Sequence, residues 1–245
     1  MRFLRTLRLE VERKTDIIAL TAFLLAVAGI LFQTYHFIRG AQVVLFPPES
    51  VLVVCYSYEN NAERFPHACQ KESYIRMSAR MAYVNTGQIG YSAVIQKESL
   101  SFSLNAQTIV HRWESFGSFS DHGEKRNRLR QDFQSDAHPV GIDGGSAVSH
   151  ETFFTPHKEG CGGRKDPCVA ERNFVTFGQF SSVVRSSETL TVYFKASLYG
   201  AEDKEVRCIA STSGLISELE DDGWSTVSCE VEQQKLWWHF LKSGG

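Results

Sequence analysis

The stretch Leu190-Thr-Val-Tyr-Phe-Lys-Ala-Ser-Leu-Tyr199 carries the clearest β-strand signal in the chain. Apolar side chains occupy every second position, at residues 190, 192, 194, 196 and 198. Because successive side chains of a strand point to opposite faces of the sheet, this period of two predicts a strand with one buried face.

Similar strand signals occur along most of the chain after Pro47-Pro48. We expect further strands near residues 51–57, 75–83, 91–96, 100–104, 108–113, 146–154, 173–180, 206–211 and 225–231. Turn-forming residues separate these segments, and helical patterns do not alternate with them. The sequence therefore predicts a mainly β protein, an antiparallel β-sandwich covering residues 51–245.

One part of this series resembles a known family. The segment Arg80-Met-Ala-Tyr-Val-Asn-Thr-Gly87, followed by a strand and then by Leu100-Ser-Phe-Ser-Leu104, is similar to the strand, Asn-Thr-Gly turn and strand of bacterial extracytoplasmic immunoglobulin-like domains. The resemblance covers about 30 residues. It implies an immunoglobulin-like β-sandwich used for adhesion, scaffolding or complex assembly, and it transfers no catalytic residue.

Residues 114–138 interrupt the series of strands. They are rich in serine, glycine and aspartate, and they contain a basic cluster formed by Lys125, Arg126, Arg128 and Arg130. We expect a loop insertion in the β domain, which is either simply solvated or a contact site for an acidic partner.

A long apolar segment lies near the N-terminus. Residues 17–38 contain no Asp, Glu, Lys or Arg. As a helix they span about 33 Å at about 1.5 Å per residue, which exceeds the bilayer core of about 30 Å. We expect a transmembrane helix over residues 17–39 and a linker over 40–50. A cleaved signal peptide, cut after Ala26-Val27-Ala28, is the alternative.

The charges on either side of this segment predict its orientation. Five cationic residues precede it, at positions 2, 5, 8, 13 and 14, whereas only Arg39 follows it before Arg64. Because Lys and Arg stay on the cytoplasmic side, we expect residues 1–16 to form a cytoplasmic tail and the C-terminal domain to be periplasmic or extracellular.

The cysteines favour the same compartment. All six lie after the apolar segment, at Cys55, Cys69, Cys161, Cys168, Cys208 and Cys229. An even number of cysteines in an oxidising compartment predicts structural disulfides. The nearest-neighbour pairing Cys55–Cys69, Cys161–Cys168 and Cys208–Cys229 is one of about 15 possible sets.

Charge and motifs exclude several functions. The net charge of −2 arises from a basic N-terminal segment and from residues 40–245, which hold 20 cationic and 25 anionic side chains. This balance does not suit a general nucleic-acid binder. The chain has no CxxC, GxSxG, P-loop or GxGxxG motif, so we predict no catalytic residue and no cofactor.

One polar cluster could carry chemistry. His138, Asp143, His150 and His157 lie within twenty residues, and metal binding or metal-dependent hydrolysis is the alternative function. The His150-Glu151 pair lacks the second histidine of HExxH, and on a strand His150 and Glu151 point to opposite faces. Hydrogen-bonded or solvent-facing histidines explain the cluster more simply.

The C-terminal segment 235–241 contains Trp237 and Trp238. As a helix it would present a stripe for the membrane interface or a partner, and as a strand it would close the core. Altogether, the sequence predicts a single-pass membrane protein and favours an interaction or scaffolding module of a bacterial envelope complex over an enzyme. Its expected partners are the bilayer and a protein.

Overall fold

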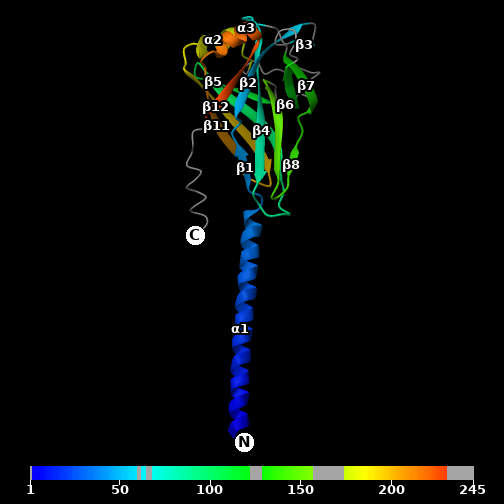
Figure 1. Cartoon of the computed structure of the whole chain (residues 1–245), viewed down its shortest axis with the longest axis vertical. Helices are drawn as coiled ribbons and strands as arrows, with labels where there is room; N and C mark the ends of the chain where they lie inside the picture. Colours follow the sequence, from blue (N-terminus) through cyan, green and yellow to red (C-terminus); the bar gives the residue numbers. More distant parts are fainter. Residues whose placement is uncertain (1, 60–61, 65–67, 122–128, 157–173, 231–245) are drawn as a thin grey trace.

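A computed structural model describes residues 2–59, 62–64, 68–121, 129–156 and 174–230. A single helix, α1 (Arg2–Arg39), leads into a β domain, and it extends away from that domain as a straight rod (Figure 1). Within α1 the segment Ile17–Tyr35 has a mean hydropathy of 2.2, and none of it is buried. The expected apolar helix is therefore present, and it is long enough to cross a membrane or to serve as a signal sequence.

The described part of the β domain contains twelve strands. In chain order they are β1 (Val43–Phe46), β2 (Ser50–Glu59), β3 (Ala62–Arg64), β4 (Tyr74–Asn85), β5 (Ala93–Leu104), β6 (Gln107–Asp121), β7 (Leu129–Asp136), β8 (Val140–Ile142), β9 (Ala147–Thr155), β10 (Thr189–Tyr199), β11 (Lys204–Ser211) and β12 (Trp224–Glu230). Two short helices, α2 (Phe177–Val184) and α3 (Leu215–Asp222), complete the described chain.

Eight of these strands form a closed antiparallel barrel. Hydrogen bonds join them in the order β4-β9-β6-β5-β10-β11-β12-β2, and β2 pairs back onto β4, so the sheet closes on itself. The prediction of an immunoglobulin-like sandwich was therefore wrong. A strand with alternating apolar residues faces a core in a sandwich and in a barrel alike. Closure of the barrel depends on the pairing of β2 with the first half of β4, and the residue pattern of a single strand does not show which strands pair.

The remaining strands extend the barrel wall. β1 pairs with the second half of β4, in the register Val43 to Asn85, and it lies within the 40–50 segment that we expected to be a linker. β8 pairs with β5, and β7 pairs with β6. The described part of the expected 114–138 loop is thus mainly strand, because pairing with β9 and β7 overrides the weak strand preference of its serines and glycines.

Large apolar side chains fill the barrel. The fully buried ones include Met77, Met81, Phe102, Phe154 and Phe194. Inward-facing residues of eight strands are enough to fill a barrel of this size. The alternation around Phe194 that opened the sequence analysis is confirmed, since residues 190, 192, 194, 196 and 198 are all buried.

The end of the barrel opposite α1 carries α2 and α3 (Figure 1). Each helix buries an apolar face, formed by Phe177, Phe180 and Val184 in α2 and by Leu215, Ile216 and Leu219 in α3. The strand expected over residues 173–180 was wrong, because α2 begins there. Thr176 and Gln179 form a capping box that satisfies the first backbone N–H groups of the helix.

Two of the expected disulfides are confirmed, Cys55–Cys69 and Cys208–Cys229. Cys55 belongs to β2, and its backbone N–H also donates to the carbonyl of Gly223 at the end of α3. The Cys208–Cys229 bridge joins β11 to β12, which pair over only two residues. The pair Cys161 and Cys168 lies outside the described residues.

Candidate functional site

A buried carboxylate, Glu98, lies inside the barrel. The alternation of β5 places Ala93 and Ile95 inward, and an extra residue opposite the step from Ser197 to Leu198 then shifts the alternation. Such a bulge re-aims the side chains that follow it. As a result Glu98 faces the interior with 1% exposure, while Gln96 and Lys97 are exposed.

Three side chains from the opposite wall donate hydrogen bonds to Glu98. The Tyr83 hydroxyl donates to Oε1 at 2.6 Å, and the Thr152 hydroxyl donates to Oε2 at 2.6 Å. His150 Nε2 lies 2.7 Å from Oε1, and in the tautomer with the proton on Nε2 it donates the third hydrogen bond. The carboxylate therefore joins β5 to β4 and β9 across the interior.

The surroundings of Glu98 control the ionisation of Tyr83. Burial raises the pKa of the Tyr83 hydroxyl far above its ordinary range, and the negative charge of Glu98 and the hydrogen bond to it raise the pKa further. The hydroxyl therefore keeps its proton and remains a donor. Three donors on one carboxylate offset much of the cost of removing it from water.

Aromatic rings link this cluster to the surface. The Phe116 ring lies 4.5 Å from the His150 ring and 5.3 Å from the ring of His138, measured between centroids. The Tyr83 ring stacks on His150 at 5.9 Å. The His150 side chain is 13% exposed, whereas that of Glu98 is fully buried. Because both oxygens of the carboxylate bond to side chains of the barrel wall, the geometry suits a structural network that fixes the interior.

The residues of the alternative metal site lie in different surroundings. His150 bonds Glu98 inside the barrel, and Asp143 is exposed and accepts a hydrogen bond from Ser92 at 2.8 Å. The exposed ring of His138 has Nδ1 3.0 Å from the carbonyl oxygen of Asp136. His157 lies outside the described residues. Within the described chain, no group of three or more His, Cys, Asp or Glu side chains is placed to hold a metal ion.

Some contact candidates cannot be placed. Lys125, Arg126, Arg128, Trp237 and Trp238 fall outside the described residues. The backbone of Arg130 lies in β7, opposite Ser120 of β6. The two expected faces of β9 are confirmed, since His150 points to Glu98 and Glu151 accepts from the Ser78 hydroxyl on the other face of the sheet.

Sequence reasoning missed a buried ion pair in the wall. Arg76 pairs with Glu114, and their side chains are only 1% and 4% exposed. The guanidinium carbon of Arg76 also lies 5.5 Å from the ring of Phe153 and 6.0 Å from that of Tyr56. The alternation of β4 correctly turned Arg76 away from the barrel interior, but a single strand does not reveal what covers its outer face.

A shallow hollow of about 420 Å³ lies beside the short helices. It is lined by the end of α2, the segment before β10, the end of β11 and the start of α3, and its lining includes Arg185, Glu188, Ser213 and Ser217. Arg185 is paired with Glu220 at its rim. Both signs of charge are present, so the hollow has no clear preference for a charged ligand.

At the α1 end, one side chain ties several segments together. Asn85 is fully buried, and its Oδ1 accepts from the backbone N–H groups of Gln42 at 3.1 Å and Gly87 at 3.0 Å. Its Nδ2 donates to the carbonyls of Tyr91 at 2.8 Å and Ile142 at 3.1 Å. Asn85 therefore fixes the segment leaving α1 against the β4–β5 loop and β8.

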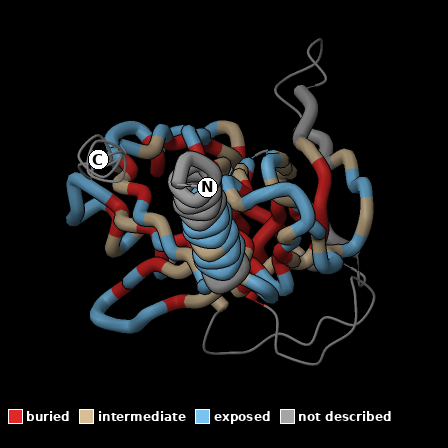
Figure 2. The backbone as a smooth tube through the Cα atoms, turned by 90° about the horizontal axis from the view of Figure 1, so that it is seen from below, coloured by how far each residue is buried: buried red, intermediate tan, exposed pale blue. Residues whose placement is uncertain are grey.

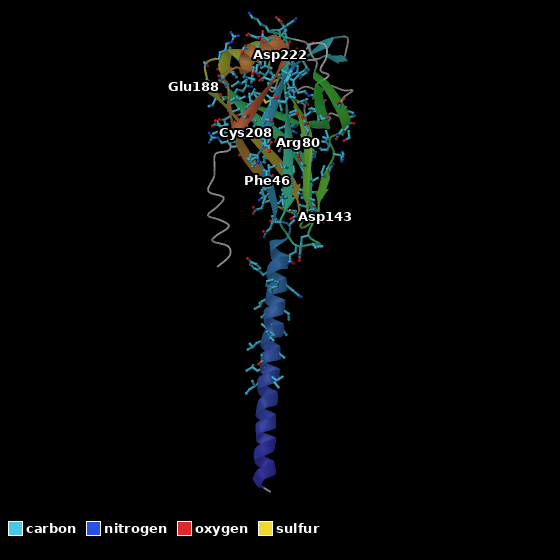
Figure 3. The ribbon with its side chains drawn as sticks, viewed as in Figure 1. Phe46, Arg80, Asp143, Glu188, Cys208 and Asp222 are labelled. Atoms are coloured by element: carbon cyan, nitrogen blue, oxygen red, sulfur yellow. A yellow bond between two sulfur atoms is a disulfide. The ribbon has the colours of Figure 1, made fainter. Side chains whose placement is uncertain are left out.

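Two exposed apolar side chains lie at this same end. Ile89, in the β4–β5 loop, is 93% exposed, and Tyr199, the last residue of β10, is 68% exposed. In Figure 3 the label Asp143 marks the loops at this end of the barrel, beside the top of α1.

No protein-family model matches the chain, and no curated protein and no solved structure is significantly similar to it.

Proposed function

We propose that this chain is a single-pass membrane protein that holds a disulfide-bonded β-barrel outside the cytoplasm as a protein–protein interaction module. The observation that carries this proposal is the continuity of α1. An exposed apolar segment as long as a bilayer core leads directly into the barrel, where its connection is fixed by hydrogen bonds.

The barrel supports an interaction role rather than a catalytic one. Its interior holds packed apolar side chains and a carboxylate already bonded to three protein donors. The disulfides support an oxidising compartment, and the basic residues before the apolar segment support a cytoplasmic N-terminus.

The candidate contact surface is the outer face of β1. Val44 and Phe46 point outward from this strand and are 37% and 42% exposed. Within the described residues, β1 pairs with β4 and its other side lies close to β11, so the part of β1 open to a partner is this outward face.

Anchoring is tested by following the N-terminus of the full chain in cells. An uncleaved anchor keeps the intact N-terminus in the membrane pellet after alkaline extraction. A soluble, shortened protein beginning near Gly29 would identify a signal peptide and overturn the anchor. Reporters fused after Gly245 test orientation: one that works only outside the cytoplasm should be active, and one that works only inside should be silent.

The contact surface is tested by placing a photo-crosslinking amino acid at Phe46 in living cells. We expect a defined covalent adduct with another protein. The matched control is Lys195 on β10, whose side chain is 52% exposed and lies on another part of the wall. Adducts of equal yield at both positions, or none at Phe46, would contradict the assignment to β1.

A further inference from the structure

We propose that the α1 end of the barrel rests on the bilayer, with Ile89 and Tyr199 inserted among the lipid headgroups. This inference deepens the proposed function and rests on it, because it takes α1 to span the membrane. The partner surface is the interface of the same bilayer that α1 crosses.

The length of α1 places the barrel at headgroup height. The run without Asp, Glu, Lys or Arg ends at Ile38, and α1 ends at Arg39, one residue before the chain turns at Gly40. The one helical residue after Ile38 rises only about 1.5 Å. The headgroup layer on each side of a bilayer is about 5–8 Å thick. The α1 end of the barrel therefore begins within the headgroup layer, and the side chains that project from this end lie among the headgroups.

The loops that carry the two side chains pack directly around the end of α1. A Cβ atom added at Gly87 would lie 3.1 Å from the carbonyl oxygen of Gly40, and one added at Gly40 would lie 4.0 Å from that of Gly200. Ile89 follows Gly87 by two residues, and Tyr199 precedes Gly200. Figure 2 views this end along α1 and shows exposed segments of the barrel around the helix.

The chemistry of the two side chains suits the interface. A tyrosine ring has an apolar body and a polar tip, and tyrosine is enriched at headgroup level. Ile89 is almost completely exposed in water, and transfer of its side chain into lipid is favourable. Their common position beside α1 distinguishes them from apolar residues scattered over a surface.

Charge does not drive this contact. Glu202 and Asp203 follow Tyr199 in the β10–β11 turn, and they lie 3.7 Å from Lys204 and 4.0 Å from Lys195. Asp143 adds a further negative charge at this end. We therefore expect the contact to be equally strong on zwitterionic and anionic lipid, and to persist in high salt.

The test uses the full chain reconstituted into phosphatidylcholine vesicles. An environment-sensitive fluorophore is attached at Ile89→Cys, at Tyr199→Cys and, as the matched control, at the exposed Ser213→Cys beside α3. We expect blue-shifted emission, quenched by lipids with headgroup quenchers, at positions 89 and 199 only. Emission typical of water at both positions would overturn the inference.

Flotation of the same vesicles separates the two proposals. Vesicles that carry the chain while labels 89 and 199 remain in water leave the anchor intact and overturn only the interface contact. A chain that does not float with vesicles overturns both. With a label at Tyr199→Cys, the second change Ile89→Ser should lower the ratio of inserted to free barrel roughly tenfold or more, as expected for loss of one large apolar contact.

Discussion

The two ends of the barrel are closed by different physical means. At the capped end, α2 and α3 lay apolar side chains over the opening, with Phe180 and Leu219 fully buried. At the α1 end, a single polar side chain, Asn85, makes four hydrogen bonds to the backbone of three separate segments. Closure by apolar packing is shared among many contacts, whereas closure by Asn85 depends on one residue and its geometry.

The two kinds of closure suit the different connections that the two ends make. Apolar packing closes an end that faces solvent and has no further connection to make. The polar tie lies where α1 enters, and hydrogen bonds have a direction that packing lacks. Asn85 thus sets the position of the connecting segment. The following substitutions test how strongly the stability of the protein depends on the apolar packing at one end and on the hydrogen bonds of Asn85 at the other.

The largest effect is expected from Phe180→Ala at the capped end. Phe180 has 0% exposure and its ring lies 6.3 Å from that of Phe102. Removing a buried phenylalanine leaves a cavity, and we expect a loss of about 3–5 kcal/mol of unfolding free energy. Urea unfolding of the full chain in detergent measures it. Phe133→Ala, at a 41% exposed position, is the control and should cost less than about 1 kcal/mol.

The second effect is expected from Asn85→Ala at the α1 end. The change leaves two buried carbonyls and two N–H groups without their partner, so we expect a loss of about 2–4 kcal/mol in the same measurement. Asn85→Asp keeps an acceptor for Gln42 and Gly87 but loses the donor to Tyr91 and Ile142, and it should not restore stability. A loss of unfolding free energy no greater than that of the exposed variant Gln88→Ala would show that the hydrogen bonds of Asn85 are dispensable.

A third effect concerns pH and the interior next to the α1 end. Because the pKa of Tyr83 is raised in the folded protein, its stabilising effect is complete below the unfolded tyrosine pKa of about 10 and is lost as pH rises above it. The unfolding free energy should fall by up to about 1.4 kcal/mol per pH unit above pH 10 from this group. Tyr83→Phe should make that decline shallower, and an unchanged slope would contradict the assignment.

The smallest effect is expected from Thr176→Ala at the start of α2. The Thr176 hydroxyl accepts a hydrogen bond from the backbone N–H of Gln179 at 3.3 Å. Loss of such a cap costs about 1 kcal/mol. Thr176→Ser keeps the acceptor and should remain near the wild-type value. Equal losses in both variants would point to the methyl group rather than to the cap.

Much of the fold followed from local patterns. The alternation of β4 and β10, the turn at Asn85-Thr86-Gly87 and the apolar part of α1 all depend on neighbouring residues, and sequence reasoning found them. The Thr176-Phe-Gly-Gln179 capping box was a readable signal for α2, but the aromatic residues around it were interpreted as strand.

The remainder depends on contacts that no local pattern contains. Glu98 faces inward because of a bulge at Gln96, and bulges leave little trace in the alternation of polar and apolar residues. Its donors come from β4 and β9, which the sequence separates from it by 15 to 54 residues. For His150 the sequence favoured a hydrogen-bonded or solvent-facing side chain over a metal ligand, and only the closed barrel reveals its carboxylate partner.

Because α1 runs without interruption up to the barrel, the rotation of the barrel about the helix axis is also fixed. Both backbone groups of Gln42 are held, by Asn85 and by Thr86, so the first residues after the helix transmit its rotation. Each residue of a helix turns the chain by about 100°, because about 3.6 residues complete a turn. Inserting one residue into α1 would therefore rotate the face around β1 by about 100° relative to the start of the helix, whereas inserting four would bring it nearly back.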